Sequence, residues 1–245
     1  MSNLDDLVSA VEVPRKTMVL FFVVDTSGSM SGAKIGAANT AIEEVLPEIA
    51  DLSAGNADAE IKIALLTFSS GAVWQTPAPI PAAHFYFSSL SAGGLTDLGQ
   101  CCEMLNEKLS RNAFMNDTVG SYAPVIFLLS DGAPTDDYQA GLGKLWQNKW
   151  FKAAIRVAIA IGSDANETVL EEFTGGKEAV LRVHTPEALR KMIQLVAIRS
   201  SQIGSTSTSS IAQEAGLSKQ NEFLGQVQAE VTQIQQDDDD DDDWE

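Results

Sequence analysis

Short, mainly apolar runs alternate along this chain with longer segments in which apolar residues recur at helical spacing. Four of the runs are rich in β-branched or aromatic residues: residues 18–25, 61–68, 125–131 and 157–162. Apolar runs of this length are typical of strands that are buried on both faces, as in a parallel sheet covered by helices. The pattern therefore predicts an α/β fold with a mostly parallel central sheet.

Five further segments have the length and the apolar spacing of helices, at about 32–53, 97–110, 138–152, 166–174 and 185–199. Because they alternate with the strands, we expect helices on both faces of the sheet. A weaker run at 179–183 should close the sheet, and residues 72–76 should form an antiparallel partner strand at one edge. Three polar residues are suited to cap or open helices: Ser31, Asp97 and Thr185.

The composition changes near residue 200. A Ser/Thr-rich stretch is followed by Gln-rich residues 211–236, whose scattered apolar residues favour at most a weak helix, and then by seven consecutive aspartates, Asp237 to Asp243. A run of like charges repels itself and is typical of disordered segments. We therefore expect one domain, 1–199, and a flexible linker with an acidic tail, 200–245.

The formal net charge of the 245-residue chain is −18. The chain stays acidic even without the seven aspartates, which argues against binding to a nucleic-acid backbone. The N-terminus carries Asp5, Asp6 and Glu12 in place of the basic region of a signal peptide, and the apolar run 18–24 is too short to span a bilayer. Cys101 and Cys102 are adjacent and form no disulfide framework. These features predict a cytoplasmic protein.

Polar side chains stand where the predicted strands end. Asp25 ends the first predicted strand, and Asp131 ends the strand at 125–131. Ser27 and Ser29 follow Asp25 at every second position, and Thr96 lies in a Gly-Gly-Leu-Thr-Asp turn. Because ligands of open α/β sheets bind outside the carboxyl ends of the strands, we expect these groups to converge. An all-oxygen set suits Mg²⁺, with Mn²⁺ as a second possibility. The alternative is that the serines only shape a turn and cap the next helix.

Three motifs make a family resemblance specific. DTSGSM at 25–30 resembles the DxSxS motif of the von Willebrand factor A (vWA) domain, GGLTDLG at 93–99 resembles its threonine loop, and SDGAPTDD at 130–137 resembles its second aspartate loop. The resemblance covers about 16–199 and implies a Rossmann-like, mostly parallel sheet with one antiparallel edge strand. It also implies a metal-ion-dependent adhesion site in which Ser27, Ser29 and Thr96 contact the metal, while Asp25 and Asp131 act directly or through water. A carboxylate from a partner protein would fill the open position.

Within this superfamily, the three motifs look most like those of the bacterial tellurite-resistance TerY group. That resemblance implies a stress-response system in which a Ser/Thr protein kinase and a PP2C-type phosphatase are partners. Some proteins of that group carry a C-terminal region resembling a zinc ribbon. This chain departs from them, because it has no Cys or His after His184 and ends in the acidic tail instead.

Catalytic motifs give little support to an enzyme. The sequence has no GxxxxGK[ST] phosphate loop, no HExxH and no GxSxG after a strand. A haloacid-dehalogenase-like phosphatase would need a second aspartate two residues after Asp25, where Ser27 stands. The sequence favours a non-catalytic protein-binding module, with a Mg²⁺-dependent phosphoryl-transfer or hydrolytic enzyme as the alternative.

Two further features allow two interpretations each. Trp146 and Trp150 are four residues apart and share a helix face, which is either core or part of a contact surface. Asp136 and Asp137 either begin a helix or point to a second metal.

Overall fold

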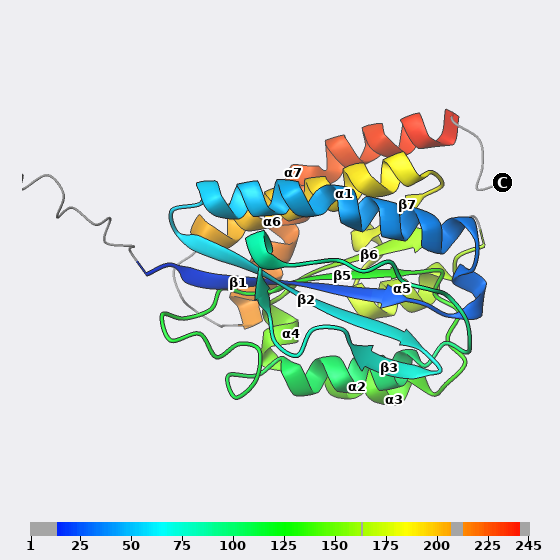
Figure 1. Ribbon diagram of the computed structural model, residues 1–245, viewed down its shortest axis with the longest axis horizontal. Helices are drawn as coiled ribbons and strands as arrows, with labels where there is room; N and C mark the ends of the chain where they lie inside the picture. The colour runs from blue at the N-terminus through cyan, green and yellow to red at the C-terminus, as the bar shows by residue number, and fades with distance from the viewer. Residues whose placement is uncertain (1–13, 163, 207–212, 241–245) are drawn as a thin grey trace, which may run out of the picture.

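The computed structural model describes residues 14–162, 164–206 and 213–240, which form one central sheet between two layers of helices (Figure 1). The strands are β1 (Lys16–Asp25), β2 (Ala59–Ser69), β3 (Gly71–Trp74), β4 (Ile80–Pro81), β5 (Val125–Ser130), β6 (Ile155–Ile161) and β7 (Val180–Val183). Their order is β3-β2-β1-β5-β6-β7, and β4 also pairs with β2. Only β3 and β4 are antiparallel to their neighbour among these strands. The predicted fold class, mostly parallel with an antiparallel edge, is confirmed.

Two sets of helices cover the two faces. One face carries α1 (Ala33–Gly55), α6 (Pro186–Thr206) and α7 (Gln213–Asp240), and the other carries α2 (Leu98–Lys108), α3 (Tyr138–Leu145), α4 (Lys149–Ala153) and α5 (Glu167–Thr174). Short 3₁₀ turns lie at η2 (Gly28–Met30), η3 (Ala82–His84) and η4 (Lys177–Ala179). Along β1, Leu20 and Phe22 belong to the first core and Phe21 and Val23 to the second. The apolar run is continuous because both faces of the strand are buried.

The predicted helix at 138–152 is two helices in the structure. Asn148 separates α3 from α4, and its side-chain oxygen accepts hydrogen bonds from the backbone N–H groups of Trp150 and Phe151. Its amide nitrogen donates to the backbone oxygens of Asn106 and Leu109. The chain therefore restarts its helix at an asparagine cap that is also tied to the end of α2.

Of the three predicted helix caps, Thr185 is confirmed. Its hydroxyl accepts a hydrogen bond from the backbone N–H of Ala188, in the first turn of α6. Ser31 and Asp97 make no side-chain cap in the structure; α1 begins after Gly32 instead. Asp97 does stand at the start of α2, where its backbone oxygen accepts from the N–H of Cys101, but its carboxylate accepts from the backbone N–H of Gly71 and holds the turn between β2 and β3.

The C-terminal part of the chain departs most from the prediction. Helix α6 continues to Thr206, through the expected domain boundary at 199, and residues 213–240 form α7 instead of a flexible segment. Along α7, Phe223, Val227 and Val231 recur every four residues and are 0, 1 and 8% exposed. This one apolar stripe buries the helix against the domain. The expected flexible tail is therefore wrong for 213–240, while 207–212 and 241–245 lie outside the described residues.

Two polar contacts fix α7 at its two ends. The amide oxygen of Gln220 accepts from the backbone N–H of Arg156 in β6, and its amide nitrogen donates to the Arg156 backbone oxygen. Near the other end, the carboxylate of Asp238 accepts from the backbone N–H of His184 and from the hydroxyl of Thr185. The second of the seven aspartates is thus a buried anchor. None of the helices within the described ranges combines the length and the apolar character needed to cross a bilayer.

Candidate functional site

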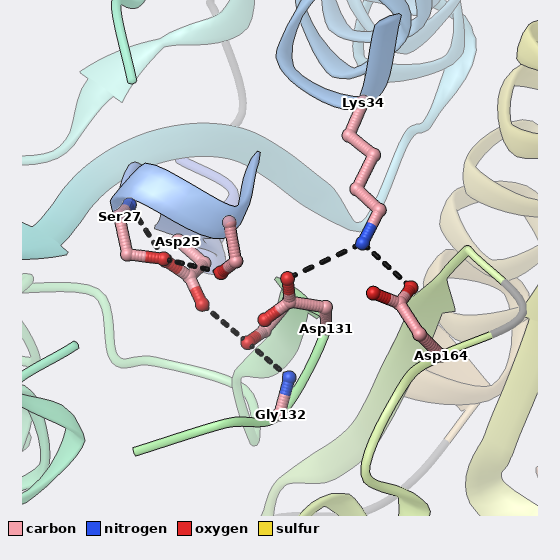
Figure 2. Close-up of polar contacts among 8 residues, drawn as sticks. Asp25, Ser27, Lys34, Asp131, Gly132 and Asp164 are labelled. Carbon is pink, nitrogen blue, oxygen red and sulfur yellow. Dashed lines mark hydrogen bonds and ion pairs between the residues drawn. The ribbon is translucent and has the colours of Figure 1, made fainter. Parts of the chain in front are cut away.

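The two predicted aspartates meet at the carboxyl edge of the sheet. Strands β1 and β5 are parallel neighbours, with Val24 opposite Leu129, so the ends of both strands lie side by side. Asp25 ends β1 and Asp131 directly follows β5, and the two residues are 0% and 2% exposed. The topology therefore buries two carboxylates at one place, as predicted (Figure 2).

The Asp25 carboxylate is held by hydrogen bonds to both oxygens. Oδ1 accepts from the backbone N–H of Ser27 at 2.8 Å, and Oδ2 accepts from the hydroxyl of Ser130 at 2.6 Å. Burial raises the pKa of the Asp25 carboxyl above its ordinary value; the bonds from Ser130 and Ser27 oppose that shift, and the charge of Asp131 adds to it. Removal from water thus disfavours the charged form of Asp25, and a nearby cation would restore it.

Ser27 and Ser29 place their hydroxyls together. Their Oγ atoms are 3.0 Å apart in the turn that leads from β1 into η2. Ser27 is buried whereas Ser29 is exposed, so the pair extends from the buried carboxylates to the surface.

The Thr96 loop is bound to the same turn by backbone hydrogen bonds. The N–H of Gly28 donates to the oxygen of Gly94 at 3.1 Å, and the N–H of Gly93 donates to the oxygen of Thr26 at 2.8 Å. Gly94 has φ +89°, and a Cβ there would lie 2.7 Å from the Ser70 hydroxyl, so the loop needs a glycine at this point. Thr96 itself is buried, and the two backbone bonds hold its loop against the loop of the two serines.

A second pair of bonds ties Thr96 to the loop after β5. The N–H of Thr96 donates to the Thr135 hydroxyl, and the N–H of Thr135 donates to the Thr96 oxygen, each at 2.9 Å. All three motifs are therefore joined by hydrogen bonds, although their ligand roles stay predictions.

One carboxylate oxygen tests whether a cation fits this site. Oδ2 of Asp131 lies 3.4 Å from the Lys34 ammonium, but its Oδ1 is buried and has no hydrogen-bond partner within the described part of the chain. A buried carboxylate oxygen without a partner is costly and points to an ion or a water. No group of three or more His, Cys, Asp or Glu side chains suited to a metal occurs in the described ranges. A cation here would therefore depend on the hydroxyls, and the residues fit a hard divalent ion.

The sequence analysis missed three polar residues of the site: Lys34, Ser130 and Asp164. Lys34 reaches from the first turn of α1 to Asp131 and to the Asp164 carboxylate, 2.7 Å away (Figure 2). Its hydrogen bond lowers the pKa of the Asp164 carboxyl. Ser130, directly before Asp131, also accepts from the N–H of Gly132. Only Ser130 had a local signal, because it is a hydroxyl residue at the end of a strand, directly before Asp131.

Contacts in the structure bear on the two open alternatives. A carboxylate oxygen of Asp136 accepts from the N–H groups of Gly99 and Gln100, so Asp136 caps the start of α2. Trp150 is buried, and Trp146 donates to the Glu172 oxygen while its ring stacks on the Arg156 guanidinium, whose centre lies 4.7 Å from the ring centre. Both tryptophans thus pack against the core. The cap accounts for one oxygen of Asp136, while its Oδ1 is buried without a hydrogen-bond partner in the described residues, so the second-metal alternative stays open.

Comparison with known proteins agrees with this arrangement. Residues 20–195 match the family model of the von Willebrand factor type A domain. No curated protein sequence gives a significant match. Similar solved structures include a von Willebrand factor type A protein from Catenulispora acidiphila (TM-score 0.54, 17% identity, 75% of this chain and 42% of that one). Another is the pilus adhesin SpaC from Lactobacillus rhamnosus GG (TM-score 0.57, 18% identity, 75% of this chain and 30% of that one).

A third similar structure is proximal thread matrix protein 1 from the mussel byssus (TM-score 0.55, 16% identity, 76% of this chain and 48% of that one). It was solved with a zinc-occupied MIDAS (metal-ion-dependent adhesion site) motif. Identities this low indicate a shared fold. The chain spans less than half the length of each of these three proteins.

Proposed function

Because this chain belongs to the von Willebrand factor type A domain family, we propose that it is a non-catalytic module that binds a partner protein through a divalent metal. The observation that carries the proposal is the buried Oδ1 of Asp131, which lacks a partner beside a second buried carboxylate, Asp25. A divalent cation beside these carboxylates would offset the cost of their burial and supply the partner that Oδ1 of Asp131 lacks.

The proposed ligands are those expected from the motifs: Asp25, Ser27, Ser29, Thr96 and Asp131. Mg²⁺ is the proposed ion and Mn²⁺ the second choice, since oxygen ligands suit both. The zinc-occupied motif of the mussel protein supports a divalent ion. A bound ion would neutralise the aspartates and offer a coordination position to an outside ligand.

The proposed outside ligand is an acidic residue of a partner protein. The exposed Ser29 leaves the site accessible, and Leu95, directly before Thr96, is 58% exposed and could contact the partner's apolar side chains. The resemblance of the motifs to the TerY group supports a Ser/Thr kinase and a PP2C-type phosphatase of a bacterial stress or tellurite-resistance-type system as partners. Free, buried Cys101 and Cys102 are compatible with a cytoplasmic location.

The first prediction tests the metal. MgCl₂ or MnCl₂ should raise the melting temperature of the wild-type chain, since a ligand at 100 times its Kd stabilises by about 2.7 kcal/mol. Thr96→Val keeps the shape of the side chain but removes its hydroxyl, so it should lose this stabilisation with an unchanged circular dichroism spectrum. Ser31→Ala, at an exposed serine just after the motif, is the control and should respond like the wild type.

A wild-type chain that neither ion stabilises would overturn the proposal. The same variant should also lose any partner that EDTA removes from the wild-type chain. Hydrolysis of p-nitrophenyl phosphate that requires Mg²⁺ and Thr96 would instead favour the enzymatic alternative.

A further inference from the structure

Lys34 places a positive charge in the wall of the proposed metal site. Its ammonium lies 3.4 Å from Oδ2 of Asp131 and 2.7 Å from Oδ1 of Asp164, and its side chain is only 14% exposed. Figure 2 shows the side chain descending from α1 to the two carboxylates. Lys34 thus reaches an aspartate that would hold the metal.

The backbone around Lys34 is built to receive this side chain. Gly162, directly after β6, has φ +93°, and a Cβ there would lie 2.7 Å from Cε of Lys34 and 3.0 Å from its Nζ. The backbone N–H of Asn166 donates to the backbone oxygen of Asp131 at 2.7 Å, which joins the loop after β6 to the loop after β5. The position of Lys34 therefore follows from the packing of the first turn of α1 against the loops after β5 and β6.

The two carboxylates share the ammonium unequally. The Asp164 contact is 0.7 Å shorter than the Asp131 contact, at 2.7 Å against 3.4 Å, and the Asp164 side chain is 71% exposed while that of Asp131 is 3% exposed. Water screens the charge of Asp164, but little water separates Lys34 from Asp131. An ion bound to Asp131 would therefore feel the positive charge of Lys34 more strongly than the negative charge of Asp164.

We infer that Lys34 is a resident counter-charge, which steadies Asp131 without metal and weakens the binding of a divalent ion until an anionic ligand arrives. This inference rests on the proposed function. In the buried part of the site, a divalent ion and Lys34 together exceed the two negative charges of Asp25 and Asp131 by one, and the exposed, screened charge of Asp164 offsets this excess only in part. A partner's carboxylate supplies the missing negative charge, so metal and acidic partner bind tightly only together.

The affinity of the full chain for Mn²⁺ tests this inference. It is measured by the loss of the electron paramagnetic resonance signal of free Mn²⁺, with and without acetate as the carboxylate probe. Lys34→Met keeps the length of the side chain and removes the charge. It should bind Mn²⁺ alone at least tenfold more tightly than the wild type, and acetate should add less to its affinity. Lys144→Met removes an exposed lysine of α3 that pairs with Glu103 and not with a proposed ligand, so it should behave like the wild type.

Asp164→Asn gives an independent test at an exposed position. Without Asp164 the ammonium is free to approach Asp131, so Mn²⁺ should bind severalfold more weakly. In the Lys34→Met background, the same change should have a smaller effect, because only the screened charge of Asp164 is then lost. Equal effects in both backgrounds would contradict the inference.

The outcomes separate the inference from the proposed function. A folded wild-type chain that binds no Mn²⁺ would end the proposed function. A wild-type chain that binds Mn²⁺ while folded Lys34→Met binds it equally or more weakly would overturn only the role of Lys34. If Lys34→Met fails to fold, an unchanged affinity in Asp164→Asn would overturn it instead.

Discussion

Asp117 shows how one carboxylate fastens a long connection. It lies between α2 and β5, and Oδ2 accepts from the Thr17 hydroxyl in β1 at 2.6 Å and from the Lys62 ammonium in β2 at 3.2 Å. Its Oδ1 accepts from the N–H of Val119. Burial alone would raise the pKa of Asp117, but the bonds from Thr17, Val119 and Lys62 outweigh burial and lower it.

This shift predicts a pH-dependent stability. Since the folded pKa lies below the unfolded value of about 3.9, the charged carboxylate stabilises the fold above that value, and its contribution is lost as pH falls through the folded pKa. Asp117→Asn should therefore cost about 2 kcal/mol at pH 7 and less at pH 3, below the unfolded pKa, by urea unfolding. Asp51→Asn, exposed on α1, is the control. An equal cost at both pH values would mean that the charge is not the source.

At the residue scale, the sequence predicts groups at strand ends and misses those brought in by distant elements. Asp25 and Asp131 are visible because each interrupts an apolar run where a strand must end. Lys34 looks like any surface lysine of a helix, and its partner Asp164 lies 130 residues away. Long-range ion pairs leave no periodic trace in a sequence, so half of the charged groups at this site could not be predicted.

At the element scale, β1 was predictable from its own residues, whereas α7 depends on contacts with distant residues. A strand buried on both faces carries its signal in every residue, and every strand except the two-residue β4 was predicted to within two residues of its ends. In α7 the buried stripe is diluted by glutamine and aspartate, and the helix depends on contacts of Gln220 and Asp238 with residues 64 and 54 positions away. Composition alone therefore favoured a flexible segment.

The role of Gln220 can be tested directly. At Arg156 the backbone of β6 has no partner in β7, whose pairing begins at Ala158, and the Gln220 amide fills this place. Gln220→Ala would leave a buried donor and a buried acceptor unpaired, at a cost of about 2–4 kcal/mol in urea unfolding. Hydrogen exchange should show α7 losing protection before the sheet. Gln226→Ala, at an exposed position of the same helix, is the control; if both variants cost the same, α7 is not anchored by this contact.

At the scale of the whole molecule, α7 brings negative charge to the edge of the sheet that holds the proposed metal site. Its C-terminal end lies where the parallel strands end (Figure 1), and Asp238 contacts His184 and Thr185 just after β7. Acidic residues at a helix C-terminus oppose the helix dipole. Here Asp238 lies beside the N-terminus of α6, whose positive dipole end offsets that cost.

The last prediction concerns the five aspartates after Asp238 in an already acidic chain of net charge −18. Replacing residues 239–243 by asparagine should weaken Mn²⁺ binding severalfold at 10 mM salt, where charges interact over about 30 Å, and leave it unchanged at 1 M, where the range is about 3 Å. The same replacement in the Thr96→Val background measures any Mn²⁺ that the aspartates bind themselves. Tighter binding of acetate at the metal after the replacement would show instead that the aspartates compete with acetate for the open coordination position. Only in that case does their removal free this position.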